Sequence, residues 1–197
     1  MLHRSVHALA FILATVSTAP AAQADDITDS IQEGLKQYEA GRYSEAAASL
    51  TYASQLILQK KGDALKTALP PALPGWQAEA GESSAAGAAL GAGLTVSRRY
   101  RKDGADIKVR IVTDSPMIQG VAMMLANPIM ATSGGGRLER VGGEKALVQF
   151  DPQNRRGELQ MMIGNRFLVS IEGRNVARED LLAYAGAVDL EVLRKLP

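Results

Sequence analysis

The sequence predicts an α+β protein in which an N-terminal helical hairpin precedes a mainly antiparallel β-sheet with helices packed on one face. Apolar residues recur at helical spacing through residues 25–69. From Leu94 onward they alternate with polar residues, as they do in strands that bury one face. Strands joined by short turns, with few helices between them, are typical of this fold class.

The first 24 residues have the features of a cleavable secretory signal peptide. Arg4 precedes an apolar run, ALAFILATV at residues 8–16, and Ala22-Gln23-Ala24 supplies the small-x-small pattern that signal peptidases cut. The apolar run is too short to span a hydrocarbon core of about 30 Å, and no later segment is long and apolar enough to do so. We therefore expect cleavage after Ala24 and a periplasmic protein. The alternative is a buried N-terminal helix.

Residues 25–69 form the predicted helical hairpin segment. Gly41 ends the first helix, and Ser44 is a good N-cap for the second. Gly62 and Asp63 are expected to interrupt the second helix, and a short third helix is expected to end at Leu69. Each of the first two helices has one apolar stripe: Ile27, Ile31, Leu35 and Tyr38 in the first, and Ala46, Leu50, Ala53 and Ile57 in the second.

The pattern Tyr38-x-x-Gly41-x-Tyr43-x-x-Ala46-x-x-x-Leu50-x-x-Ala53 resembles the junction and second helix of a tetratricopeptide repeat. It occurs once, whereas a stable solenoid needs about three repeats. The resemblance therefore implies a single repeat-like hairpin, in a family that mostly binds peptides or proteins. It makes Tyr38 and Tyr43 candidate protein-binding residues. The alternative is an ordinary helix pair packed on the following domain.

Residues 70–80 are predicted to form a proline-rich linker and a first strand, and residues 81–197 an α+β domain. The run PPALPG at 70–75 stops any helix. Residues 81–93 are mostly Gly, Ala and Ser, which predicts a mobile loop.

Two β-hairpins in this domain have a predicted register. The turn Asp103-Gly104 pairs Tyr100 with Ile107 and places Arg99 opposite Lys108. In the last hairpin, a three-residue loop at 164–166 separates the apolar from the polar face better than a two-residue turn does. That register pairs Ile163 with Phe167.

The remaining elements follow from local signals. Ser115-Pro116 predicts the start of a helix that ends near Asn127-Pro128. Two strands are expected at about 137–141 and 145–150, and one or two helices at 177–195. The element order, together with Pro74-Gly75-Trp76, weakly resembles the PsbP and Mog1 fold group. That resemblance implies a largely non-enzymatic protein.

Composition excludes several kinds of chemistry. The only histidines, His3 and His7, lie in the predicted signal peptide, and the chain has no cysteine. The exported chain would therefore lack Ser-His-Asp and Cys-His catalysis, imidazole or thiolate metal sites, and disulfides. Without Arg4, 21 basic residues balance 21 acidic ones, and this balance gives no electrostatic signal for nucleic acid. We expect no cofactor and no enzymatic activity.

A basic sheet face is the best-defined candidate ligand site. The predicted register places four cations on one face, and opposed like charges there repel each other. An anionic or lipid-like ligand would relieve that repulsion. The alternative is a solvated face with Asp103 and Asp106 nearby. The four cations are Arg99, Arg101, Lys108 and Arg110.

Two further features have competing interpretations. Arg98 interrupts an otherwise apolar strand face; it either anchors a carboxylate or extends to solvent at the sheet end. Met117, Met123 and Met124 could supply thioether ligands for Cu(I). Methionine is also a normal core filler, and Met117, Met124 and Met161 fall on predicted core faces.

Four functions remain open from the sequence. The favoured one is a non-enzymatic exported protein that acts through protein contact, as an adaptor or a chaperone-like protein. The second is a carrier or sensor of a small hydrophobic or anionic ligand, held between the sheet and its Met-rich helix. An enzyme that uses carboxylates, Lys or Ser is one further alternative, and a Met-based copper-binding protein is the other.

Overall fold

The computed structural model describes residues 25–85, 93–127, 129 and 135–196. The predicted signal peptide and most of the predicted loop at 81–93 lie outside these residues. Within the described part of the chain, no helix is long and apolar enough to cross a membrane.

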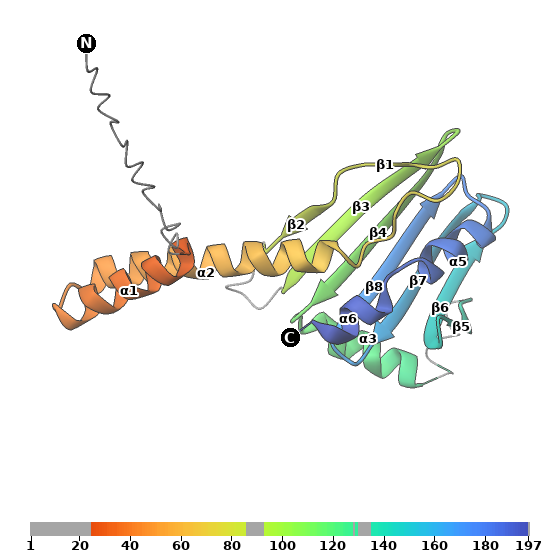
Figure 1. Cartoon of the computed structure of the whole chain (residues 1–197). Coiled ribbons are helices and arrows are strands. Elements are labelled where there is room, and N and C mark those ends of the chain that lie inside the picture. The colour runs from red at the N-terminus through yellow and green to blue at the C-terminus, as the bar shows by residue number, and fades with distance from the viewer. Residues whose placement is uncertain (1–24, 86–92, 128, 130–134, 197) are drawn as a thin grey trace, which may run out of the picture.

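An antiparallel sheet of eight strands forms the body of the protein and confirms the α+β class (Figure 1). Its order is β1-β3-β4-β8-β7-β6-β5, and β2 also pairs with β3. The short strands β1 and β2 therefore follow one another along the outer edge of β3. The strands are β1 (Gln77–Ala78), β2 (Glu82–Ser84), β3 (Leu94–Lys102), β4 (Ala105–Thr113), β5 (Arg137–Val141), β6 (Glu144–Asp151), β7 (Arg156–Ile163) and β8 (Phe167–Arg174).

Helices cover both faces of the sheet, although the sequence predicts helices on one face. α5 (Arg178–Gly186), α6 (Leu190–Lys195) and the end of α2 (Tyr43–Lys66) pack on the face that contains Val109 and Ile171. α3 (Met117–Ala126) packs on the opposite face, against Val112, Leu168 and Leu147. The alternation along β4 and β8 exposes apolar side chains on both faces near one end of the sheet, and α3 covers this second cluster.

Both predicted hairpin registers are confirmed. Tyr100 pairs with Ile107 and Arg99 with Lys108, and Ile163 pairs with Phe167. Asp103 and Gly104 both have positive φ angles, 46° and 78°, as a two-residue turn that matches the strand twist requires. Turn chemistry and face segregation therefore determine these pairings locally.

Three predicted features of the N-terminal half are wrong. The N-cap of α2 is Arg42, not Ser44. α2 continues through Gly62 and Asp63 to Lys66, and no separate third helix forms. Gly62 lies within the helix and allows α2 to pack closely on Ser83, because a Cβ at Gly62 would lie 2.9 Å from the Ser83 Cβ. β2, which contains Ser83, occupies part of the segment predicted as a loop.

The proline-rich segment is tied to the core. The Tyr100 hydroxyl donates to the Pro70 carbonyl at 2.7 Å. The centroid of the Tyr184 ring lies 4.4 Å from that of Tyr100 and 5.4 Å from that of Trp76, which it meets edge-on. Burial raises the pKa of Tyr100 to about 12, so the phenol stays protonated and can donate this hydrogen bond also in alkaline solution, where an ordinary tyrosine ionises.

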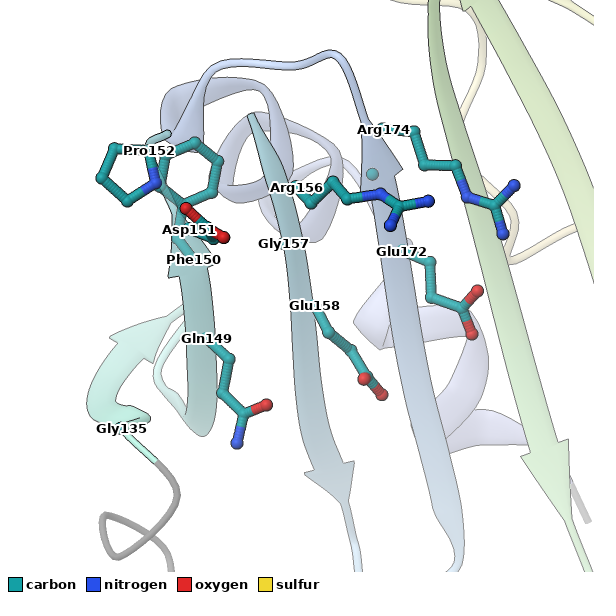
Figure 2. Close-up of a pocket in the computed structure, with 11 residues that line it drawn as sticks. Gly135, Gln149, Phe150, Asp151, Pro152, Arg156, Gly157, Glu158, Glu172 and Arg174 are labelled. Carbon is teal, nitrogen blue, oxygen red and sulfur yellow. The ribbon is translucent and has the colours of Figure 1, made fainter. Parts of the chain in front are cut away.

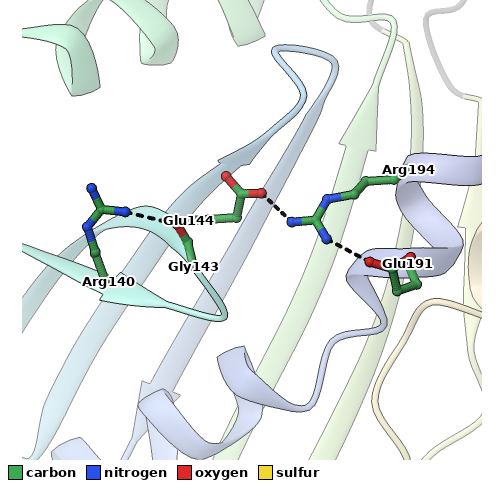
Figure 3. Close-up of polar contacts among 5 residues, drawn as sticks. All are labelled: Arg140, Gly143, Glu144, Glu191 and Arg194. Carbon is green, nitrogen blue, oxygen red and sulfur yellow. Dashed lines mark hydrogen bonds and ion pairs between the residues drawn. The ribbon is translucent and has the colours of Figure 1, made fainter.

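An ion-pair network attaches α6 to the turn between β5 and β6 (Figure 3). Arg194 contacts Glu144 at 2.7 Å and Glu191 at 2.9 Å. These hydrogen bonds raise the pKa of Arg194. Arg140 donates to the Gly143 carbonyl and so closes the same turn.

Candidate functional site

The two N-terminal helices form a hairpin that projects beyond the sheet (Figure 1). α1 (Asp26–Glu39) runs antiparallel to the first part of α2. Small residues fill the contact between them, because the buried positions are Gly34 in α1 and Ala46 and Ala53 in this part of α2. A Cβ at Gly34 would lie 2.8 Å from Leu50 Cγ, so the helices approach closely there.

Large apolar side chains lie beside this contact rather than inside it. The predicted stripes are therefore not the buried interface of the hairpin, except at Ala46 and Ala53. Seven large side chains on the hairpin are between 44% and 67% exposed. One is Tyr52, which lies two residues from Leu50 and so on another side of α2. The other six are Ile31, Leu35, Tyr38, Tyr43, Leu50 and Ile57. The tight approach at the small residues leaves no room for larger ones between the helices.

These six side chains share one side of the hairpin, which we call the hairpin face. Ile31, Leu35 and Tyr38 follow helical spacing in α1, and Tyr43, Leu50 and Ile57 recur every seven residues in α2. The Tyr38 and Tyr43 rings meet at 5.8 Å across the turn. Leu50 packs against Gly34. The apolar row of α1 and the apolar row of α2 therefore meet along the line where the two helices touch.

The hairpin face is also electrically neutral along α2. No charged residue occurs between Glu45 and Lys60. Charged residues flank this stretch at both ends: Glu39, Arg42 and Glu45 lie near the tip, and Lys60 pairs with Asp25 at 2.9 Å at the base. The central part of α2 thus presents apolar and small polar side chains without charge, which makes it suited to contact with another apolar surface.

The structure brings together the four predicted cations of the basic sheet face but supplies them with acidic neighbours. Arg99 lies 3.4 Å from Asp106, Arg101 lies 2.8 Å from Glu79, and Arg110 forms an ion pair with Glu172. Lys108 is the register partner of Glu172 on β8. Strand pairing therefore relieves much of the like-charge repulsion without a ligand.

Beside these cations lies a shallow hollow of about 720 Å³ over β6, β7 and β8 (Figure 2). Glu158 and Glu172 are opposed across β7 and β8, and Figure 2 shows them near Arg156 and Arg174 on the same sheet face. Gln160 donates to Glu158 at 2.6 Å. None of these residues is a predicted site residue, although the predicted β7–β8 register already places both glutamates on one face.

Arg98 does not extend to solvent at the sheet end. It is half-buried, and its Nη1 donates to the Pro70 carbonyl at 3.0 Å. It shares this acceptor with Tyr100. In the structure, Arg98 therefore attaches the proline-rich segment to β3. Ligand binding by Arg98 stays a prediction.

The methionines of α3 are divided between surface and core. Met117, expected on a core face, is 61% exposed, and Met123 is 69% exposed. Met124 packs against the cluster of Leu125 and Leu147, and Met161 is fully buried as expected. Among the described residues, no group of three His, Cys, Asp or Glu side chains could hold a metal ion.

No family model matches this sequence, and no curated protein and no solved structure is significantly similar to it. The resemblances to a tetratricopeptide repeat and to the PsbP and Mog1 group therefore stay predictions.

Proposed function

We propose that this chain is a non-enzymatic exported protein that works in the periplasm by binding another protein through its hairpin face. The observation that carries the proposal is the row of six large apolar side chains exposed along one side of a projecting helical arm. It acts as an adaptor or a chaperone-like protein, with the sheet domain as the base that holds the arm.

Physical reasons support a bound partner at this surface. A contiguous exposed apolar patch usually marks an interaction site. A repeat-like helix pair cannot bury its own apolar face, and in repeat proteins the neighbouring unit covers it. Tyrosines such as Tyr38 and Tyr43 are enriched among the residues that contribute most to protein binding.

The absence of reactive side chains from the exported chain supports binding over catalysis. Histidine is the usual proton-transfer group near neutral pH, and cysteine is the strongest common nucleophile. Residues 25–197 contain neither. A protein with this composition is better suited to hold a partner than to transform a substrate.

Site-specific crosslinking in cells tests the proposal. A photoreactive residue replaces Tyr43, and the captured protein is identified. We expect one specific partner, and at least tenfold less capture when Leu35→Lys and Leu50→Lys place charges on the hairpin face.

Met117→Lys provides the matched control, because Met117 is as exposed as Tyr38 but lies on α3. This variant should capture the partner as the unmodified chain does. Capture that survives the two hairpin substitutions, or that Met117→Lys reduces equally, would count against the proposal.

A further inference from the structure

An apolar pocket that is partly open to solvent lies at the base of the hairpin, where α2 meets the end of the sheet. Its volume is about 360 Å³. Ile57, Ala64 and Leu65 from α2 form one wall, and Phe167 and Leu196 form the opposite wall. Ile57 also belongs to the hairpin face, but the other wall residues do not.

Three cations border this cavity: Lys60, Lys61 and Arg166. No acidic side chain is among the described residues that line it. Lys60 and Lys61 each contact a carboxylate outside the lining, Asp25 at 2.9 Å and Asp114 at 2.5 Å. Because a lysine ammonium has three donors, each can keep its aspartate and still bind a further oxygen.

The fold gathers polar donors at one end of the cavity. Thr113 is the last residue of β4 and the register partner of Phe167. Arg166 precedes Phe167 and donates to the Leu196 carbonyl at 2.9 Å. Asp114 follows Thr113 and brings Lys61 to the same place. Thr113, Arg166 and Lys61 therefore surround the end of β4.

The Thr113 side chain supplies an independent observation. Thr113 is fully buried and lines the cavity, and its hydroxyl has no hydrogen-bond partner among the described residues. A buried hydroxyl without a partner costs free energy. A ligand oxygen placed beside it would remove that cost.

We propose that this cavity binds a single-chain amphipathic carboxylate of the fatty-acid class. The carboxylate lies among Thr113, Lys61 and Arg166, and the acyl chain lies between Leu65 and Phe167. A volume of about 360 Å³ is near the lower end of the range of ligand pockets, about 300–1,000 Å³. It accommodates one medium-length chain and excludes a two-chain phospholipid.

This site lies on the opposite sheet face from α3, whereas the sequence-based carrier hypothesis places a ligand against the Met-rich helix. Ligand binding in this cavity does not require a protein partner on the hairpin face. Purified protein and a defined amphiphile suffice to test it, so it can fail or succeed separately from the proposed function.

Calorimetric titration of the purified chain with sodium decanoate, below its micelle concentration, tests the site. We expect saturable binding with one ligand per chain. Decyltrimethylammonium, which has the same chain length and the opposite charge, should bind at least tenfold more weakly. Absence of decanoate binding, or equal affinity for the two amphiphiles, overturns the proposal.

Two substitutions locate the binding within the chain. Ala64→Leu fills the cavity and should weaken decanoate binding at least tenfold, whereas Ala47→Leu, at an exposed position of α2 outside the cavity, should change it less than twofold. Equal affinity in both variants overturns the location.

Thr113→Val keeps the side-chain shape and removes the hydroxyl, so it should weaken binding about threefold or more. Circular dichroism establishes that each variant is folded. If Ala64→Leu does not fold, Thr113→Val decides the question, and unchanged affinity in that variant contradicts the placement of the carboxylate.

Discussion

At the scale of single residues, two opposed glycines form the slot that receives α5. Gly157 and Gly173 are partners across β7 and β8. A Cβ on Gly173 would lie 2.7 Å from Leu181 Cδ2, and one on Gly157 would lie 2.5 Å from Leu181 Cδ1. Leu181 is fully buried. The missing side chains therefore allow the helix to lie close to the sheet.

We expect Gly173→Ala to lower the free energy of unfolding by about 1–3 kcal/mol, because an added methyl group overpacks this slot. Urea denaturation followed by circular dichroism measures the effect. Gly120→Ala is the matched control: nothing lies within 4 Å of a Cβ there, and alanine should stabilise α3 by about 0.5–1 kcal/mol. A Gly173→Ala protein as stable as the parent would contradict the proposed slot.

At the scale of elements, the hairpin is anchored at one end only. Leu65, at the end of α2, and the following Ala68 and Leu69 belong to the main core. Toward the tip, the buried residues are the small ones that separate the two helices. Most helical stability in proteins comes from packing of an apolar face, and this hairpin leaves that face exposed.

Hydrogen exchange should reveal this gradient. We expect the amides of α1 to exchange much faster than those of β4, with the last two turns of α2 in between, because local opening is easiest where little apolar surface is buried. Mass spectrometry of exchanged peptides measures the three segments in one experiment. Protection of α1 equal to that of β4 would show that the isolated hairpin is already stable.

The elements differ in how well local sequence predicts them. The β3–β4 and β7–β8 registers follow from turn residues and alternation within about twenty residues of chain. For the two apolar stripes of the hairpin, helical periodicity identifies the apolar face without identifying what covers it. Gly62 is predicted to interrupt a helix. The local sequence cannot show that Ser83 packs against Gly62 and that a glycine is needed there for this reason.

At the scale of the whole molecule, the strand order determines the electrostatics of the basic sheet face. β4 lies between β3 and β8, so Glu172 comes next to Lys108 and forms an ion pair with Arg110. The sequence correctly predicts that the four cations share a face. It does not reveal the carboxylate, because Glu172 is more than 60 residues away along the chain.

The place where the whole molecule works can be tested directly. N-terminal sequencing of protein recovered from the periplasm of the producing cell should begin at Asp25, because signal peptidase cuts after the small residues at 22–24. Recovery of a chain that begins at Met1 and is held in the cytosol or a membrane would contradict export, and it would restore His3 and His7 to the functional protein.

Local patterns, namely periodicity, turn residues and composition, were enough to predict the fold class, two strand registers and the residue types available for chemistry. The helical and strand periodicities and the two turns depend on residues that are close together in the sequence, so local backbone geometry alone constrains these elements. Three features required the tertiary structure: the exposure of the hairpin face, the place of Glu172 beside Lys108 and Arg110, and the cavity around Thr113. The last two arise where segments far apart in sequence pack together, and the first depends on which parts of the chain cover the hairpin. Such long-range packing depends on all the surfaces of the chain at once.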